Sequence, residues 1–348
     1  MYFVGLDEFS LAVLQPEVFL GVAEAGFFPG IMYYLTKWAT NAQRAKFIAI
    51  FMASIGLSGC LAGPLAGMIL SNMDGVLELR GWQWLFILEG IPAILLGITA
   101  YFYLDETPAD AKWLSADEQN AIQHQIELES KALESHDSQS ILSLFKQKQF
   151  YALFIIGTGI LGGGAAIMFW IPTIFKRAGI ENFVEIGLYS AIPFSFAVVT
   201  QFLIARSSDA RQERVWHTVT PLIFAIAGWI AMATLPLNFA GSLMAMTVIT
   251  MGSLGAMGPF WAMPCSFIHS ELRAAGIAII STIGGIASFI QPIAAGYLNY
   301  ATGDLTGGFV YNASAISLAV ILFMALIKSG AIKNVVTEPK LSSFNRLP

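Results

Sequence analysis

The sequence predicts an all-α polytopic membrane protein. Of its 348 residues, 56% are hydrophobic and only 12% are charged, and the mean hydropathy is +0.67. Soluble domains usually carry about 25% charged residues. The apolar residues gather in runs of roughly 20, the length that a helix needs to cross about 30 Å of hydrocarbon. We therefore expect transmembrane helices in a lipid bilayer.

Nine apolar segments meet this requirement. They cover approximately residues 16–36, 47–70, 82–104, 150–175, 184–205, 216–236, 242–264, 274–298 and 307–327. Glycine and proline inside them are tolerated in a membrane, because neighbouring helices satisfy the freed backbone groups. The register of residues 1–18 stays open, since MYFVGLDEFSLAVLQ is neither a clear leader nor a clear span.

The placement of Lys and Arg predicts the orientation. Three of the 18 basic residues, Arg80, Lys176 and Arg177, fall on one side of the predicted membrane, and the other 15 fall on the opposite side. Basic residues in short loops concentrate on the cytoplasmic side. We therefore expect a multi-pass protein of the cell inner (plasma) membrane with a cytoplasmic C-terminus.

The longest polar interval, Asp105 to Lys148, separates three spans from six. Within it, Ser115 and Glu118 have the spacing of a capping box at the start of a helix. The expected domains are an incomplete N-terminal bundle at 1–104, a cytoplasmic central loop at 105–148, a six-helix bundle at 149–328 and a cytoplasmic tail at 329–348.

The second and eighth spans form an internal repeat. RAKFIAIFMASIGLSGCLAGPLAG starts at Arg44 and RAAGIAIISTIGGIASFIQPIAAG at Arg273, with glycine at equivalent places in both. Parallel repeats are the architecture of transporters built from two six-helix halves. On that plan the first half lacks three helices. A chance match between glycine-rich helices is the alternative.

Five stretches resemble the major facilitator superfamily, and within it the anion:cation symporter family of organic-acid permeases. They are GVAEAGFFPGIMYYLTKW (21–38), GWQWLFILEGIPAILLG (81–97), LDETPADAKWLSADE (104–118), SDARQERVWH (208–217) and GPFWAMP (258–264). The resemblance implies two helical bundles with about nine of the usual twelve transmembrane helices present. It also implies proton-coupled uptake, by alternating access, of tartrate, a sugar acid such as galactonate or rhamnonate, phthalate or hydroxyphenylacetate. A truncated, inactive or sensor/partner protein of the same family is the alternative.

Glu24 is the candidate for proton coupling. A charged side chain in a span costs roughly 2.5 to 3.5 kcal/mol on insertion scales, so it normally faces a cavity or a partner. Apolar surroundings favour the neutral, protonated carboxyl group. The resemblance implies the same role, and a hydrogen-bonded structural acid is the alternative. We interpret the second intramembrane acid, Glu89, as structural.

Substrate contacts are expected at Glu17, Trp170, Trp261, Ser281 and Gln291. Glu17 stands where the resemblance implies an arginine for the substrate carboxylate, so the chain departs from the family there. The others are the polar or amphipathic groups inside second-half spans, and the resemblance favours Trp261. Aromatic side chains near span ends are otherwise interfacial anchors.

Two further sets are expected to serve gating and packing. The resemblance implies hinge and packing roles for Gly59, Gly63, Pro64 and Gly67, since small residues let helices approach closely. Asp209, Arg211 and Arg214 resemble the second-half gating motif, and ordinary positive-inside charge is the alternative.

The sequence predicts neither an enzyme nor a nucleic-acid-binding protein. Cys60 and Cys265 are far apart, and no metal or cofactor pattern is present. GTGILG (157–162) lies inside an apolar span with no preceding strand, so it is not a dinucleotide fingerprint. The expected partners are a small organic anion and a proton, and we expect a monomer. Sodium is the alternative coupling ion.

Overall fold

The computed structural model describes residues 18–24, 26–39, 41–134, 141–211, 213–236, 238–268 and 272–330. Within these ranges every regular element is a helix, which confirms the predicted all-α class. The chain divides into two compact units, Met1–Ile48 with Leu104–Asp137 and Ala49–Tyr103 with Ser138–Pro348.

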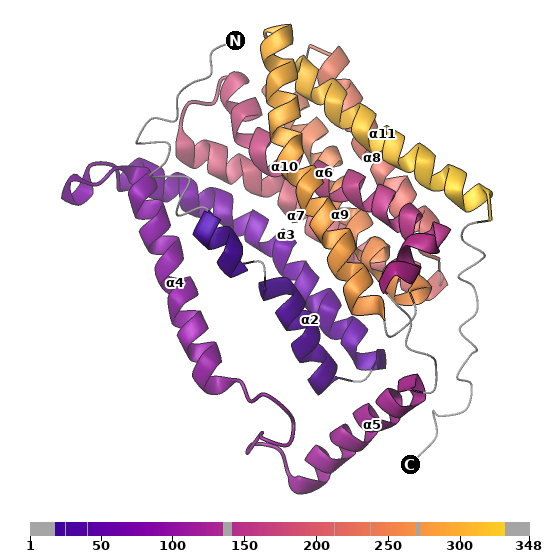
Figure 1. Ribbon diagram of the computed structural model, residues 1–348. Coiled ribbons are helices and arrows are strands. Elements are labelled where there is room, and N and C mark those ends of the chain that lie inside the picture. Colours follow the sequence, from indigo (N-terminus) through magenta and orange to yellow (C-terminus); the bar gives the residue numbers. More distant parts are fainter. Residues whose placement is uncertain are drawn as a thin grey trace. The chain divides into compact units, whose positions relative to one another are not determined.

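Six long helices form a bundle in the larger unit (Figure 1). They are α6 (Lys148–Arg177), α7 (Phe183–Arg211), α8 (Val215–Thr234), α9 (Phe239–Phe267), α10 (Arg273–Thr302) and α11 (Thr306–Lys328). Helix α6 packs against α9, α10 and α11, while α9 packs against α7 and α8. The short helix η2 (Ile141–Lys146) precedes α6.

Glycines on α6 allow its neighbours to approach. A Cβ atom on Gly157 would lie 2.9 Å from the ring of Phe260 on α9 and 3.3 Å from Ile280 on α10. A Cβ atom on Gly162 would contact Ala287 of α10 at 3.7 Å. The residue numbers of the contact increase on both helices, from Gly157 to Gly162 on α6 and from Ile280 to Ala287 on α10. Helices α6 and α10 therefore run in the same direction. Alternate spans of a membrane bundle have this relation.

The larger unit also holds most of α3 (Asn41–Asn72), the short η1 (Val76–Glu78) and α4 (Gly81–Tyr103). Gly81 begins α4 with its N–H donating to the Asp74 carboxylate at 2.8 Å, and a Cβ on Gly81 would meet the backbone of Leu70. The 18-residue apolar window of α4 has no buried residue. Its apolar side chains are therefore presented to the surroundings.

The smaller unit contains α2 (Phe27–Trp38) and α5 (Ala116–Glu134). Trp38 stacks on Trp113, with ring centroids 5.9 Å apart. The predicted capping box is confirmed at the start of α5: the backbone and hydroxyl of Ser115 donate to Glu118 at 3.0 and 2.7 Å, and the Glu118 N–H donates back to the Ser115 hydroxyl at 3.4 Å. These bonds from Ser115 lower the pKa of Glu118.

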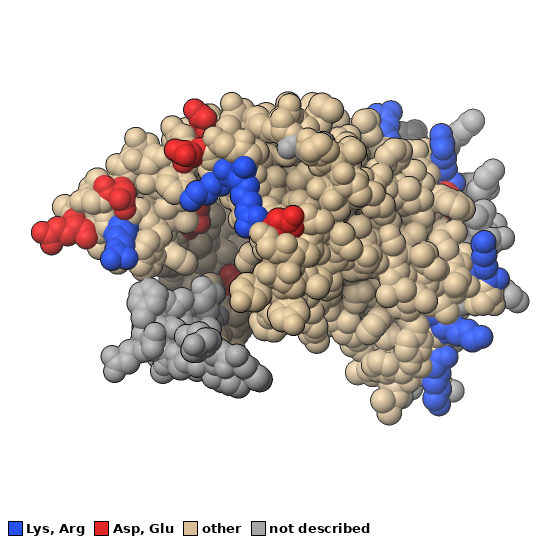
Figure 2. Space-filling model, turned by 90° about the horizontal axis from the view of Figure 1, so that it is seen from above, with Lys and Arg blue, Asp and Glu red and all other residues tan. Residues whose placement is uncertain are grey.

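Eight helices within the described residues are long and apolar enough to cross a membrane, namely α3, from Ser54, and α4 and α6 to α11. They correspond to eight of the nine predicted spans. Over the first predicted span the structure has helical residues 18–24, a turn at Gly26 and then the 12-residue α2. Figure 2 shows that most of the visible surface carries no charged side chain, as expected for a protein surrounded by lipid.

Candidate functional site

Glu24 lies in the helical residues 18–24, directly before the turn at Gly26 that begins α2. Its side chain is exposed and makes no ion pair with any described residue of the chain. Glu89 on α4 is exposed as well. Glu17 lies outside the described residues. The described chain therefore leaves the Glu24 carboxylate accessible rather than locking it into a scaffold.

Three of the predicted substrate residues share an unusual property. Trp170 Nε1, Ser281 Oγ and the side-chain Oε1 of Gln291 are buried and have no hydrogen-bond partner. Most buried polar atoms in proteins are paired, because a buried unpaired group costs about 1 to 3 kcal/mol. Hydroxyl and carboxylate groups are of the kind that pair with such atoms.

The predicted residues fall on two levels of the bundle. Phe260 and Ile280 meet at Gly157, so their neighbours Trp261 and Ser281 lie at one level of α6. Gln291 lies ten residues further along α10, about 15 Å at 1.5 Å per residue. Trp170 lies eight residues beyond Gly162 on α6, and Gln291 lies four residues beyond Ala287 on α10, in the same direction. Trp261 and Ser281 thus lie at one level along the bundle, and Gln291 and Trp170 lie further along it.

Two polar residues of the same interior were not predicted from the sequence. Asn312 of α11 is 2% exposed, accepts from the Gln291 amide at 3.2 Å and donates to the Gly308 carbonyl at 2.8 Å. Ser253 of α9 is buried and its hydroxyl has no partner. Asn312 was detectable as the one amide in its apolar span. Ser253 lies among glycines and gave no distinct signal.

The interior of the described residues is mainly apolar, and its few buried polar side chains are uncharged. Its buried polar side chains are those of Ser190, Ser208, Thr218, Ser242, Thr250, Ser253, Gln291 and Asn312. No group of three or more His, Cys, Asp or Glu side chains among the described residues is arranged to hold a metal ion. The polar groups that the described interior offers are therefore hydroxyl, amide and indole groups.

The predicted packing glycines face α7. A Cβ on Gly59 would clash with the Phe194 ring, and one on Gly63 would lie 2.8 Å from the Gly187 carbonyl oxygen. Gly67 meets the backbone of Phe183 in the same way. Pro64 lies inside α3 on this stretch. Backbones in such close contact can move against each other without side chains interlocking.

The predicted gating charges lie around the turn between α7 and α8. Arg214 pairs with Asp209 and donates to the Ser208 hydroxyl at 3.0 Å. Glu213 accepts the N–H groups of Trp216 at 2.7 Å and His217 at 3.1 Å, so it caps α8. The charge pair thus fastens the end of α7 to the start of α8. Arg211 is exposed and takes no part in the pair.

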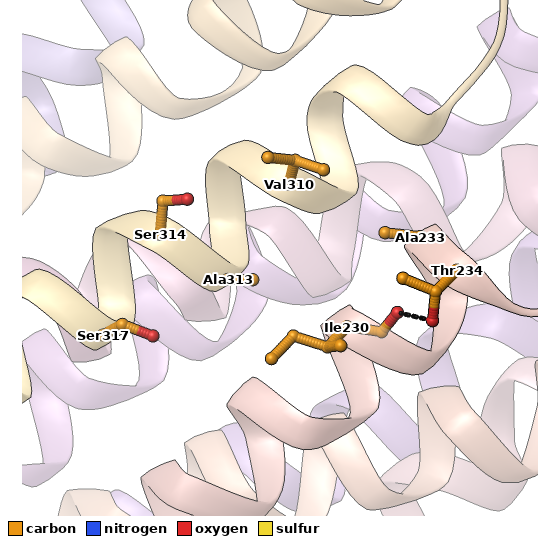
Figure 3. A pocket seen from close by; sticks show the side chains of 7 residues that line it. All are labelled: Ile230, Ala233, Thr234, Val310, Ala313, Ser314 and Ser317. Carbon is orange, nitrogen blue, oxygen red and sulfur yellow. Dashed lines mark hydrogen bonds between the residues drawn. The ribbon is translucent and has the colours of Figure 1, made fainter.

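Two grooves open between the C-terminal helices. One of about 270 Å³ lies between α8 and α11 and is lined by Ile230, Ala233, Thr234, Val310, Ala313, Ser314 and Ser317 (Figure 3). Its Thr234 hydroxyl bonds back to the Ile230 carbonyl at 2.8 Å. The second, of about 510 Å³, lies between α7, α8 and α9. Neither contains Trp170, Trp261, Ser281 or Gln291.

The known proteins that this chain is similar to are described as transporters. The profile described as Major Facilitator Superfamily matches residues 17–292. A protein of Agrobacterium vitis described as a tartrate transporter is 37% identical over 310 residues, which are 89% of this chain and 71% of that protein. The metabolite transport protein NicT of Pseudomonas putida is 36% identical over 311 residues, 88% of this chain and 70% of NicT.

The inner membrane transport protein RhmT of Escherichia coli is 31% identical over 280 residues, 79% of this chain and 63% of RhmT. Among solved structures, a bacterial homologue of the human lysosomal transporter Spinster, in an inward-facing and occupied conformation, aligns with a TM-score of 0.60 at 14% identity. The alignment covers 88% of this chain and 75% of the homologue. At that identity the likeness concerns the fold alone.

Proposed function

This chain belongs to the major facilitator superfamily, a family of transporters and not of enzymes, and on that premise we propose that it takes up a small organic anion together with protons by alternating access. The observation that carries the proposal is the 37% identity, over 89% of the chain, to the Agrobacterium vitis protein described as a tartrate transporter. NicT and RhmT, also described as transport proteins, support the same class.

The interior of the bundle supports a polyhydroxy or carboxylic acid as the solute. Tartrate carries two carboxylates and two hydroxyls, all of which can hydrogen-bond. Trp170 Nε1 is a donor without a partner, the Ser281 hydroxyl can donate or accept, and Gln291 Oε1 is a free acceptor. We propose that these groups, with Trp261 on α9, contact the substrate and line its binding site. Glu17, which stands where the resemblance implies an arginine, stays part of the proposed substrate site.

Glu24 is the proposed proton carrier. Its carboxylate is accessible and makes no ion pair with any described residue. Protonation neutralises the side chain and so lowers the cost of moving it through a closed, dry state. Alternating access then requires the contact between α3 and α7 to rearrange as the central passage opens to either side.

We also propose that the protein is a monomer of the inner membrane with a cytoplasmic C-terminus. In the six-helix bundle, Lys148, Arg211 and Lys328 lie at one set of helix ends, whereas Lys176 and Arg177 lie at the other. The larger basic set belongs on the cytoplasmic side. The division of the chain at a cytoplasmic segment 105–148 is part of the same proposal.

The test is transport by the purified chain in proteoliposomes. We expect an inward proton gradient to drive accumulation of labelled tartrate. Glu24→Gln should abolish accumulation but leave exchange of internal for external tartrate. Glutamine can form hydrogen bonds, but it cannot bind and release a proton as a carboxylate does. Glu89→Gln is the matched control and should accumulate like the original. Full accumulation by the Glu24→Gln protein would remove Glu24 from the mechanism.

A further inference from the structure

The larger of the two grooves runs along the outside of the C-terminal bundle. Its volume is about 510 Å³. Helix α7 contributes Thr200, Ile204 and Arg211, α8 contributes Trp216, His217, Thr220, Pro221 and Phe224, and α9 contributes Val248, Met251 and Gly252. Trp216 and Phe224 are 55% and 58% exposed. The groove therefore opens to the surroundings of the bundle, which for a membrane protein means lipid.

The fold fixes the shape of this groove. Helices α7 and α8 both pack closely on α9 but make little contact with each other. On α9, a Cβ at Gly252 would clash with the backbone of α8 at Pro221, and a Cβ at Gly255 would lie 2.8 Å from Ile204 of α7. Gly252 thus forms part of a floor with α7 and α8 as walls. The opposite side of α7, around Phe194, faces α3.

The groove is apolar along its length and cationic at one end. Arg211 and Thr200 are eleven residues apart on α7, which is about 16 Å at 1.5 Å per residue. That length is close to half of the roughly 30 Å hydrocarbon core, the share of one leaflet. Thr200, Ile204, Phe224, Val248 and Met251 provide a wall for an alkyl chain.

The charge at this end is available for a ligand. Asp209 is neutralised by Arg214, and the Glu213 carboxylate is occupied by the N–H groups of Trp216 and His217 and by the His217 ring at 2.6 Å. The His217 ring also contacts the Ser207 hydroxyl at 3.0 Å. Arg211 lines the groove and makes no ion pair with any residue that the structure describes. It is the cation that an anionic headgroup would meet.

We propose that this groove binds an acidic phospholipid, with one acyl chain along the groove and the phosphate at Arg211. Trp216 lines the same groove as Arg211, and tryptophan is favoured at the level of lipid headgroups. The groove is about half as long as the hydrocarbon core is thick, and the arginine at its end makes no ion pair with any described residue, which fits a lipid better than a helix of a second protein. The α8–α11 groove of Figure 3 has no charged lining residue, so it lacks the anion end.

Native mass spectrometry of the detergent-solubilised chain tests the proposal. The probes are phosphatidylglycerol, phosphatidylcholine with the same acyl chains, and inorganic phosphate. We expect one phosphatidylglycerol per chain to be retained in preference to phosphatidylcholine. Arg211→Gln should lower its retention about fivefold, the factor equivalent to about 1 kcal/mol per basic side chain at an anionic lipid surface. Val248→Trp, which fills the groove, should abolish retention.

Arg206→Gln is the matched control, since Arg206 is exposed on the same helix but does not line the groove. It should retain phosphatidylglycerol like the original chain. Equal loss in Arg206→Gln and Arg211→Gln would overturn the proposal, because the effect would then be one of general surface charge. Equal retention of the two lipids would overturn it too, and so would binding of inorganic phosphate alone. A second copy of the chain that stays bound in both the original chain and Val248→Trp would also overturn it. Monodisperse elution of each variant confirms that it is folded.

Discussion

Ser281 and Ser288 lie two turns apart on α10 and differ in their hydrogen bonds. The Ser288 hydroxyl donates to the carbonyls of Leu161 and Gly284, at 3.1 and 3.0 Å, and so ties α10 to α6. The Ser281 hydroxyl is buried without a partner. A structural serine and a ligand-binding serine should therefore respond in opposite ways to the same substitution.

Ser281→Ala should leave the thermal unfolding temperature unchanged or raise it, because it removes an unpaired buried hydroxyl. The same substitution should raise the KM for tartrate by roughly two- to tenfold, the loss of one hydrogen bond worth about 0.5 to 1.5 kcal/mol. Ser288→Ala should do the reverse, lowering the unfolding temperature at unchanged KM. The pair is measured by uptake kinetics and by thermal unfolding in detergent. A fall in stability for Ser281→Ala at constant KM would assign it to packing.

For single residues, the sequence predicted which side chains are unusual better than it predicted which side chains they contact. Trp170, Ser281 and Gln291 stood out because polar atoms are rare in apolar spans, and the structure finds a buried unpaired atom on each. Their separation into two levels depends on which helices run parallel, and no local pattern contains that information. The pairing of Gln291 with Asn312 joins two helices and was invisible for the same reason.

The contact between α3 and α7 is closely packed, and the proposed transport cycle requires it to rearrange. Gly63→Ala would place a methyl group 2.8 Å from the Gly187 carbonyl oxygen and 3.3 Å from the Ser190 side chain. The helices must separate to admit it, at a cost of about 1 to 3 kcal/mol for overpacking. We expect a lower unfolding temperature and slower transport, both measured in the same preparation.

Gly285→Ala is the control for that substitution. Gly285 is the counterpart of Gly56 in the repeat, yet nothing lies within 4 Å of a Cβ at this position. Alanine should be neutral or stabilising there, by up to about 1 kcal/mol from helix propensity. Equal destabilisation by both substitutions would show that the glycines act through helix flexibility and not through the α3–α7 contact.

The start of α5 provides a prediction about pH. Hydrogen bonds from Ser115 hold the pKa of Glu118 below its ordinary value of 4.5. A lowered pKa means that the helix favours the carboxylate, so the stabilisation is present above pH 4.5 and is lost as the pH falls through the lower, folded value. Circular dichroism of a peptide covering 110–134 should therefore show helix content falling below pH 4.5. The drop should be smaller in Glu118→Gln, and an identical profile in the two peptides would contradict the assignment.

Hydropathy predicted the elements well where an apolar run is long. Helices α6 to α11 overlap their predicted spans and extend beyond several of them, as from 184–205 to Phe183–Arg211. The extension arises because helical hydrogen bonding continues into the polar ends of a span. Over the first predicted span the described residues are helical at 18–24, form a turn at Gly26 and continue as α2. Glycine and proline are common inside membrane helices, so the sequence alone does not mark that turn.

Over the whole molecule, the superfamily was predictable from the sequence because its signal comes from several stretches that follow one another in a fixed order along the chain. The repeat between residues 44–67 and 273–296 and the five resembling stretches pointed to two related bundles, and the profile match over residues 17–292 bears out the superfamily. The lipid groove was not predictable, since its eleven lining residues come from three helices and share no motif.

The measurement that tests the account most directly is the pH inside sealed proteoliposomes when tartrate is added outside, followed with a trapped pH-sensitive dye. Coupled entry of anion and protons predicts acidification of the interior that follows the uptake of tartrate and is absent in Glu24→Gln. Entry of tartrate with no change in the internal pH, or only in the presence of sodium, would contradict it.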